Sequence, residues 1–363
     1  MSVEPLEAPQ AESTAFQREE VGLATRNHGM PLEALRYDTT PAGLHYLLIH
    51  FDVPEVDAGA WRLEVRGLVS RPRSLSLGEI RDMEATTLTV TLECAGNGRA
   101  MLSPRPVSQP WGQEAIGTAA WTGVELRTVL AEAGLAADAR EVVFTGLDRG
   151  IDGGLEQDYA RSLTLEEATA GGPLLAYEMN GAPLPPQHGF PLRLVMPGWY
   201  GMASVKWLRS IEAVAQPFDG YQVVHAYRFR RTEDEPGVPL SRIQPRALME
   251  PPGIPEYLSR DRFVAPGPCH VRGRAWSGWA PVARVEFSAD GGASWADADL
   301  GPAAGPYAWR PWLHTWDAGP GTYELCCRAT DAAGNVQPLR AEWNVGGYTN
   351  NSVQRVPVTV RPD

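Results

Sequence analysis

The sequence contains almost no lysine and no long apolar run, and its basic residues are scattered. Lysine and arginine together number 32, and Lys206 is the only lysine. The formal net charge is -12, which disfavours nucleic acid and anionic membrane surfaces as partners. No apolar stretch approaches the roughly 18 residues that would span a bilayer. We therefore expect no nucleic acid and no membrane among the partners.

Cysteine is also scarce, with Cys94, Cys269, Cys326 and Cys327 as the only four. No CxxC or CxxCH pattern occurs, so neither a zinc ribbon nor an attached c-type haem is predicted. The N-terminal segment has neither the basic nor the apolar region of a secretory signal. A cytoplasmic location is the expectation, or a periplasmic one if the sequence has been trimmed.

The near-absence of lysine makes Lys206 informative. Arginine is a planar fork and lysine a compact point charge, so the two cannot always be exchanged. A lysine that persists in a chain otherwise using arginine predicts a specific contact at residue 206.

The chain length of 363 residues fits two domains. Residues 1–20 are polar and acidic and are predicted to be a disordered tail. Residues 21–240 mix short strands and helices without βαβ alternation, which indicates an α+β domain. Capping boxes at Ser76–Glu79 and Thr164–Glu167 predict helix starts. Residues 241–363 turn to short strands and hairpin signals such as Asp290-Gly291-Gly292, which predict an all-β immunoglobulin-like sandwich.

The stretch Thr91-Leu92-Glu93-Cys94-Ala95-Gly96-Asn97-Gly98-Arg99 carries the clearest chemical signal. An alternating apolar strand runs into Cys94 and breaks at two glycines, which let the backbone approach a ligand closely. A thiolate at such a turn, with Arg99 five residues on, is a candidate metal ligand or reactive group. A buried structural cysteine is the alternative from these residues alone.

This stretch resembles the cysteine motif of the sulfite oxidase family, in its haem-free bacterial form. Other segments resemble the family in the same order: Arg26-Asn27-His28-Gly29, Phe144 to Asp148, Gln187-His188-Gly189-Phe190-Pro191-Leu192-Arg193, and Ser204-Val205-Lys206-Trp207. The resemblance implies a molybdopterin domain followed by an immunoglobulin-like dimerisation domain. It also implies that Cys94 is the one protein ligand to molybdenum.

Two sets of site residues follow from the resemblance. The implied contacts to the molybdenum–molybdopterin cofactor are Asn27, His28, Asp148, His188, Arg193, Ser204, Val205 and Lys206. The implied substrate-pocket residues are Arg26, Arg99, Trp111, Tyr227 and Arg310. Arg310 matches the arginine that the second domain contributes in sulfite-oxidising members, and it favours sulfite over nitrate. Position 98 departs from the family, because it is glycine where animal members have a second arginine.

The implied function is the oxidation of sulfite to sulfate by oxygen-atom transfer at a cysteine-ligated molybdenum centre. No haem is expected in the chain, so the electrons would pass to an external acceptor such as a cytochrome, another carrier or oxygen. A homodimer is expected through residues 241–363, which include the segment Gly346–Asn351. The alternatives are a related oxotransferase, acting on carrier-bound sulfur or reducing an S- or N-oxide, and a catalytically silent binding module.

Overall fold

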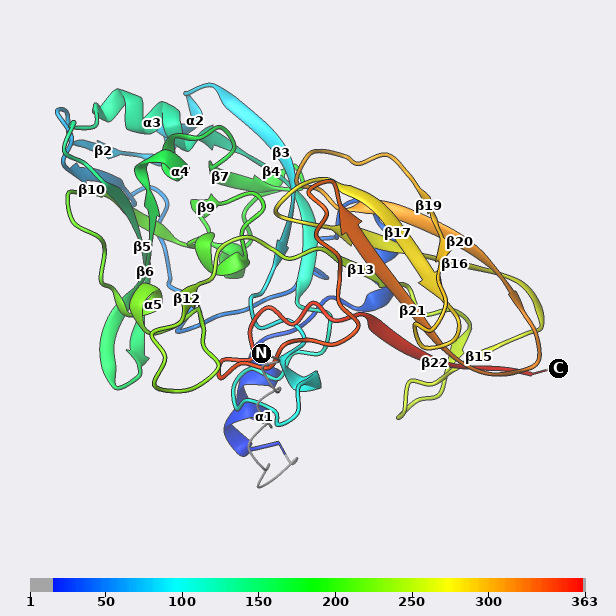
Figure 1. The fold of residues 1–363 in the computed structure, drawn as a ribbon. Coiled ribbons are helices and arrows are strands. Elements are labelled where there is room, and N and C mark those ends of the chain that lie inside the picture. The colour runs from blue at the N-terminus through cyan, green and yellow to red at the C-terminus, as the bar shows by residue number, and fades with distance from the viewer. Residues whose placement is uncertain (1–15, 362–363) are drawn as a thin grey trace.

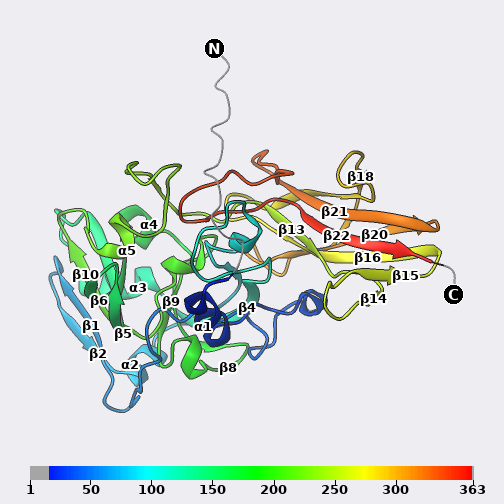
Figure 2. The same ribbon diagram turned by 90° about the horizontal axis from the view of Figure 1, so that it is seen from below.

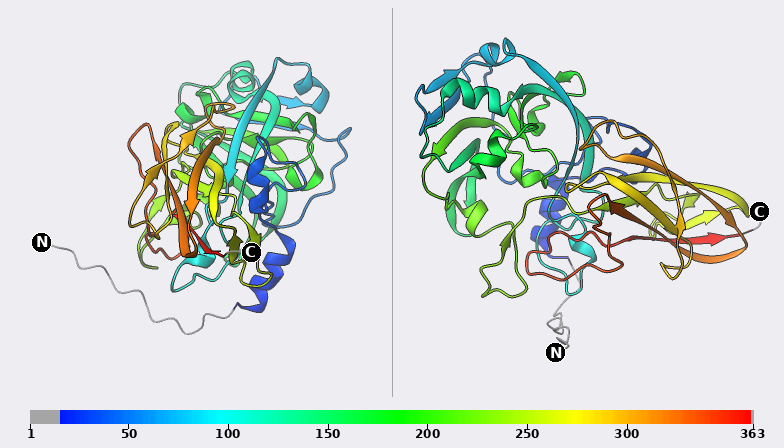
Figure 3. Two further views of the ribbon diagram at one scale, coloured as in Figure 1. Left: turned by 90° about the vertical axis from the view of Figure 1, so that its right-hand side faces the viewer. Right: turned by 45° about the horizontal axis from the view of Figure 1, so that its top comes forward.

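The computed structural model describes residues 16–361, which fold into a mixed α+β part and an all-β part lying side by side (Figure 1). Figures 2 and 3 show the all-β part projecting from one side of the first. None of the helices within residues 16–361 is long and apolar enough to cross a membrane.

The first part contains two sheets. One has the order β2 (Arg73–Leu75), β1 (Leu63–Gly67), β10 (Leu208–Val214), β5 (Glu141–Asp152) and β6 (Leu155–Thr164). Only the β1–β10 pair in it is parallel. The other has the order β3 (Ala85–Glu93), β4 (Ile116–Glu125), β7 (Leu174–Met179) and β8 (Ala182–Pro183), with β9 (Arg193–Val195) also on β7. These sheets form the frame on which the site is built.

Short helices connect and cover these strands. The α-helices are α1 (Arg18–Arg26), α2 (Leu77–Arg81), α3 (Leu126–Ala133), α4 (Leu165–Thr169) and α5 (Tyr221–Val224). The 3-10 turns are η1 (Leu32–Arg36), η2 (Arg99–Met101), η3 (Pro186–His188) and η4 (Gly201–Ala203). Both predicted capping boxes are confirmed, because Ser76 caps α2 and Thr164 caps α4.

The N-terminal helix corrects one expectation about the tail. Residues 1–15 lie outside the described residues, but α1 already begins at Arg18, inside the expected tail. Glu20 is the physical reason, because its carboxylate accepts from the backbone N–H of Gln17 and pairs with Arg105. Its side chain is 1% exposed, so the acidic residues here serve as a helix cap and a buried ion pair.

The second part is an all-β sandwich, as predicted. One sheet has the order β13 (Arg246–Met249), β16 (Gly267–Trp276), β20 (Arg310–Ala318) and β19 (Asp299–Leu300). The other has the order β14 (Ile254–Pro255), β15 (Arg262–Val264), β22 (Gln354–Val360), β21 (Gly321–Asp331), β17 (Val282–Ser288) and β18 (Ala296–Asp297). Apolar side chains from both sheets, including Val271, Phe287 and Leu325, form a common core.

The two parts are joined by more than the connecting segment that carries β11 (Arg228–Phe229) and β12 (Val238–Pro239). A separate hydrophobic cluster contains Met30 and Ile116 from the first part and Leu248, Trp276 and Trp309 from the second. The orange-to-red segment before β22 leaves the sandwich and returns to the first part (Figure 1). There Trp343 donates its indole N–H to the carbonyl of Pro104 at 2.7 Å. This contact brings the end of the chain close to the predicted site.

Candidate active site

A cavity lies in the first part, where β3 ends. Its walls come from the loop over residues 45–50, from Cys94, from strands β5 and β6, and from the segments that carry η3, η4 and Tyr227. The lining combines a thiol, cationic side chains, carboxylate and aromatic groups at one place.

Cys94 lies in the cavity wall, on a tight turn formed by residues 94–98 (the Cys94 turn). The Cys94 N–H donates to the carbonyl of Ala115 at 2.9 Å, and the Asn97 N–H donates to the carbonyl of Cys94 at 3.0 Å. A Cβ at Gly96 would lie 2.6 Å from the Arg99 guanidinium. Gly98 adopts φ +87°, a conformation that favours glycine. The backbone of the turn therefore favours glycine at Gly98, and Gly96 leaves room for the Arg99 guanidinium.

The Cys94 thiol experiences two opposing electrostatic effects. Burial raises the pKa of Cys94, and the nearby Arg99 guanidinium opposes that rise. Arg99 donates through Nε to the carbonyl of Gly346 at 2.8 Å and through NH1 to that of Gln109 at 3.2 Å. These backbone contacts hold Arg99 beside the turn.

The cavity wall contains two cationic side chains, Arg193 and Lys206. Arg193 donates to the carbonyls of His188 and Ser204, both at 3.1 Å, and Lys206 donates to the carbonyl of Leu48 at 2.7 Å. Asp148 lies there too, and one of its buried carboxylate oxygens has no hydrogen-bond partner. Burial raises the pKa of Asp148 and lowers that of Lys206, while the opposite charge of each counteracts the shift of the other.

Tyr227, Tyr159 and His50 also line the cavity. Tyr227 adopts φ +51°, an uncommon backbone conformation for a residue with a large side chain. Its hydroxyl is within hydrogen-bond distance of His50 Nε2, and the His50 and Tyr159 rings stack with centroids 4.6 Å apart. Burial, aided by Lys206, lowers the pKa of His50 to about 3, so its imidazole is neutral near pH 7.

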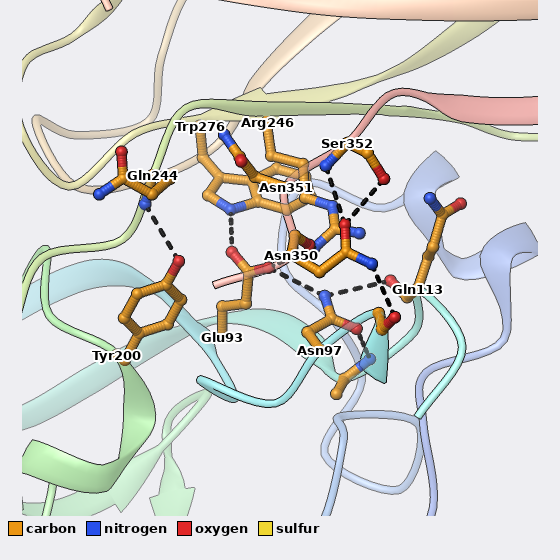
Figure 4. A network of polar contacts seen from close by, with 12 residues as sticks. Glu93, Asn97, Gln113, Tyr200, Gln244, Arg246, Trp276, Asn350, Asn351 and Ser352 are labelled. Atoms are coloured by element: carbon orange, nitrogen blue, oxygen red, sulfur yellow. Dashed lines mark hydrogen bonds and ion pairs between the residues drawn. The ribbon is translucent and has the colours of Figure 1, made fainter. Parts of the chain in front are cut away.

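Glu93, the residue before Cys94, forms a buried ion pair with Arg246 that joins the two parts of the molecule (Figure 4). Glu93 Oε1 accepts from Arg246 NH1 at 2.8 Å and from Asn97 Nδ2 at 2.9 Å. Glu93 Oε2 accepts from the indole N–H of Trp276 at 2.8 Å. The Arg246 and Glu93 side chains are 1% and 3% exposed. Because Arg246 and Trp276 belong to the sandwich, this arrangement, here named the Glu93 clamp, ties the sandwich to the base of the Cys94 turn.

Residues 346–350, in the segment before β22, also contact the Cys94 turn. Asn350 Nδ2 donates to the carbonyl of Gly98 at 2.7 Å, and the Thr349 N–H donates to that of Ala95 at 2.8 Å. Asn350 is itself tied to the Glu93 clamp, because its carbonyl accepts from Arg246 NH1 at 3.0 Å. The geometry of the turn therefore depends on residues far away in the sequence.

Comparison with known proteins agrees with this geometry. Residues 50–222 match the family described as the oxidoreductase molybdopterin binding domain, and residues 252–361 match the Mo-co oxidoreductase dimerisation domain. Sulfite oxidase of Gallus gallus is 38% identical over 337 residues, which cover 87% of this chain and 72% of that protein. The chain belongs to the sulfite oxidase family. It is accordingly a molybdenum-dependent oxidoreductase with a molybdopterin-binding domain.

Two further relatives show the range of this family. The nitrate reductase [NAD(P)H] of Hordeum vulgare is 34% identical over 88% of this chain, which corresponds to 39% of that protein. The crystal structure of the sulfane dehydrogenase SoxCD from Paracoccus pantotrophus superposes with a TM-score of 0.79 at 26% identity. The superposition covers 100% of this chain and 90% of the SoxCD chain. Both family members share the fold, so the substrate must be argued from the site.

The residues at the cavity fit the family cofactor. Cys94 supplies a thiolate, a ligand type that suits a metal whose other ligands come from the cofactor itself. The unpartnered oxygen of Asp148 and the unpartnered Nε2 of His45 are costly when buried, and the polar edge of a pterin can satisfy such groups. Arg193 and Lys206 provide positive charge for a phosphate. The donor set therefore matches a pterin phosphate beside a thiolate-ligated metal.

Many of the predicted site residues come together at this cavity. Its lining includes Cys94, Asp148, His188, Arg193, Ser204, Lys206 and Tyr227. Trp111 is 4% exposed and belongs to the same hydrophobic cluster as Cys94, and Arg99 lies behind the Cys94 turn. The individual roles assigned to these residues stay predictions.

Other predicted residues lie outside the cavity lining. Arg26 is exposed and pairs with Asp52 at 3.0 Å. Asn27 is buried, and its side chain accepts from the Ile49 N–H at 2.7 Å, so it anchors the strand-like segment beside the cavity. His28 is exposed, and Val205 is fully buried in the core. Their contacts to the cofactor remain expectations from the resemblance.

The structure corrects the expectation for Arg310. Its guanidinium donates to the carbonyls of Gly301 at 3.0 Å and Val282 at 2.8 Å, both within the sandwich, and lines a different cavity. The cause is strand alternation, because neighbouring side chains on a strand point to opposite faces. Trp309 is the residue that packs toward the first part, where its N–H donates to Thr91 Oγ1 at 2.8 Å. The argument from Arg310 in favour of sulfite over nitrate therefore does not hold.

Several residues at the site were missed by the sequence analysis. His45, Tyr46 and His50 line the cavity, and Tyr348 packs against Tyr227 with ring centroids 5.5 Å apart. One signal was available for the first group, since the run His45-Tyr46-Leu47-Leu48-Ile49-His50 holds two of the seven histidines of the chain. Nothing local to Tyr348 indicates that it packs beside a residue 121 positions earlier in the sequence.

Proposed function

We propose that this protein oxidises sulfite to sulfate and passes the electrons to an external acceptor. The observation that carries the proposal is the position of Cys94 in the wall of a cavity that is also lined by Arg193, Lys206 and Tyr227. Sulfite oxidases among the relatives and the molybdopterin-binding domain support the same reaction.

The bound cofactor would supply the two-electron redox chemistry and the oxygen atom. Cys94 would hold the metal, and His188, Arg193, Ser204 and Lys206 would hold the pterin and its phosphate. Tyr227 would hydrogen-bond the substrate, because its hydroxyl can both donate and accept. His50, being neutral and beside that hydroxyl, would orient it. The protein's contribution is thus to position the anion and to set the electrostatics around it.

We expect the purified protein to contain near-stoichiometric molybdenum and to oxidise free sulfite. Parallel assays with ferricyanide, cytochrome c and oxygen identify the acceptor class, and nitrate serves as the competing substrate. Molybdenum present without sulfite turnover by any acceptor would contradict the proposal. A lack of molybdenum in protein from a host that makes molybdopterin would count against the cofactor itself.

A related sulfur oxidation is the second candidate, because the sulfane dehydrogenase SoxCD shares the fold across the whole chain. That reaction would act on sulfur still attached to a carrier. The same assay with a thiol-bound sulfane in place of sulfite separates these reactions. An external acceptor is needed in either case, and the absence of haem and a cytoplasmic location stay predictions from the sequence.

We also propose that the protein is a homodimer formed through the sandwich, as the match of residues 252–361 to a dimerisation domain suggests. Tyr257 and Leu258 are each 83% exposed on the loop between β14 and β15, which leaves apolar surface for a partner. The segment Gly346–Asn351, which the sequence suggested for this interface, instead packs on the Cys94 turn of its own chain.

Sedimentation at micromolar concentration is expected to give the mass of a dimer, and dilution over a hundredfold range tests its stability. The charged variant Leu258→Asp checks whether this loop takes part. A monomer at every concentration would refute the dimer proposal.

A further inference from the structure

Arg161 is a buried arginine without an acidic partner. It lies on β6, is 5% exposed, and donates to the backbone carbonyl of Gln222. Its Nε is buried and has no hydrogen-bond partner, and no ion pair to Arg161 occurs within residues 16–361. Burying a charge without a counter-ion is costly unless another group compensates it. The site therefore has an unmet demand for an anion.

Arg161 faces the side of the sheet where the cavity lies. Along β6, Tyr159 and Arg161 are buried, while Ala160 and Ser162 between and after them are half-buried. Residues two apart on a strand share a face. Tyr159 lines the cavity, and the Arg161 guanidinium carbon lies 5.7 Å from the ring centroid of Tyr227, another lining residue. Arg161 is not itself a lining residue, but it lies next to Tyr227, which is one.

Arg99 contacts the neighbouring aromatic ring. Its guanidinium carbon is 5.1 Å from the ring centroid of Tyr348, which packs against Tyr227 in a tilted arrangement. Arg99 also donates to backbone carbonyls, and the neighbouring Glu93 is already used by Arg246 and Trp276. Two guanidinium groups, neither paired with a carboxylate of residues 16–361, therefore lie next to the two tyrosines.

We propose that Arg161, together with Arg99, binds the oxyanion of the substrate beside Tyr227. The inference rests on the proposed function, because it takes the substrate to be a small sulfur oxyanion. Arg161 thereby takes the place that the sequence had suggested for Arg310. A guanidinium suits this role because its planar fork donates to two oxygens at once and keeps its charge when buried.

The test compares Arg161→Met with Arg161→Lys in the molybdenum-loaded enzyme. Arg149→Met is the matched control, because Arg149 lies on the adjacent strand β5 and is 58% exposed. The measured quantities are KM and kcat for sulfite and the inhibition constant of sulfate. A hydrogen bond to a charged group is worth about tenfold to hundredfold in affinity. We expect KM and the sulfate inhibition constant to rise together by that factor in Arg161→Met, with a smaller change in kcat and unchanged molybdenum content.

Arg161→Lys separates two roles of Arg161, which are binding of the anion and the hydrogen bond to the carbonyl of Gln222. Arg161→Lys keeps the charge but loses the fork, so it should recover part of the sulfate affinity. If Arg161→Met does not fold, a rise in both constants for Arg161→Lys on the order of threefold supports the proposal. Equal sulfate affinity in wild type, Arg161→Met and Arg149→Met would overturn it, as would a loss of kcat or stability with unchanged sulfate affinity.

A failure of the proposed function gives a different result. If the wild type does not oxidise sulfite, calorimetric titration with sulfate still tests Arg161 as an oxyanion-binding residue. Sulfate binding to wild type and Arg149→Met, but not to Arg161→Met, supports the assignment without sulfite turnover. No sulfate binding to the loaded wild type overturns it.

Discussion

Cys94→Ser is expected to abolish sulfite oxidation while the protein still folds. Loss of a residue that only supports a metal ligand costs about tenfold to a hundredfold at metal sites, so loss of the thiolate itself should exceed a hundredfold. The change replaces sulfur by oxygen in a side chain of similar shape. A buried hydroxyl without a partner costs about 1–3 kcal/mol, so a small loss of stability is expected.

The measurements are turnover, molybdenum content and thermal unfolding on the same preparation. Cys269→Ser is the matched control, because Cys269 lies on β16 of the sandwich, outside the cavity. Cys269→Ser should keep full activity. Activity of Cys94→Ser within tenfold of wild type would show that Cys94 is not the metal ligand.

Breaking the Glu93 clamp is expected to give the largest loss of stability among single substitutions at the site. Arg246→Met leaves the Glu93 carboxylate buried with only Asn97 and Trp276, and Glu93→Gln leaves the Arg246 charge buried without a counter-ion. Removing one partner of a buried ion pair costs about 3–5 kcal/mol. The double variant removes both charges and should therefore cost clearly less than the sum of the single variants.

Urea unfolding of the four proteins of this double-mutant cycle gives the coupling free energy directly. The exposed pair Arg231–Glu342, with side chains 57% and 58% exposed, provides the control cycle. Exposed pairs contribute about 0–1 kcal/mol, so that cycle should show little coupling. Additive losses at Glu93 and Arg246 would mean that the two side chains do not act as a pair. Loss of molybdenum from the single variants would further show that the clamp supports the Cys94 turn.

The features that could be predicted from sequence are those fixed by local chemistry. The capping boxes at Ser76 and Thr164, the glycines of the Cys94 turn and the turn at Asp290 each depend on a few adjacent residues. Lys206 could be found because a single lysine among many arginines stands out, and it does line the cavity. The family motifs then predicted Arg193, the other cationic residue of the cavity wall.

The features that could not be predicted depend on how distant strands meet. Arg310 and Trp309 are adjacent, and only the orientation of β20 decides which of them faces the first part. Arg161 belongs to no motif, and its importance comes from the absence of an acid near it in space. Tyr348 and Asn350 reach the Cys94 turn through a segment that leaves the sandwich, and no local signal encodes that path.

The position of Arg246 has a consequence for how the protein is made. Translation proceeds from the N-terminus, and domains that can fold do so as they emerge from the ribosome. While only the first part has emerged, Glu93 has neither Arg246 nor Trp276, and Gly98 lacks Asn350. The Cys94 turn of the nascent chain is therefore left without this support until residues 246–350 have been added. We therefore expect the turn to take its final geometry only after the second part has been made.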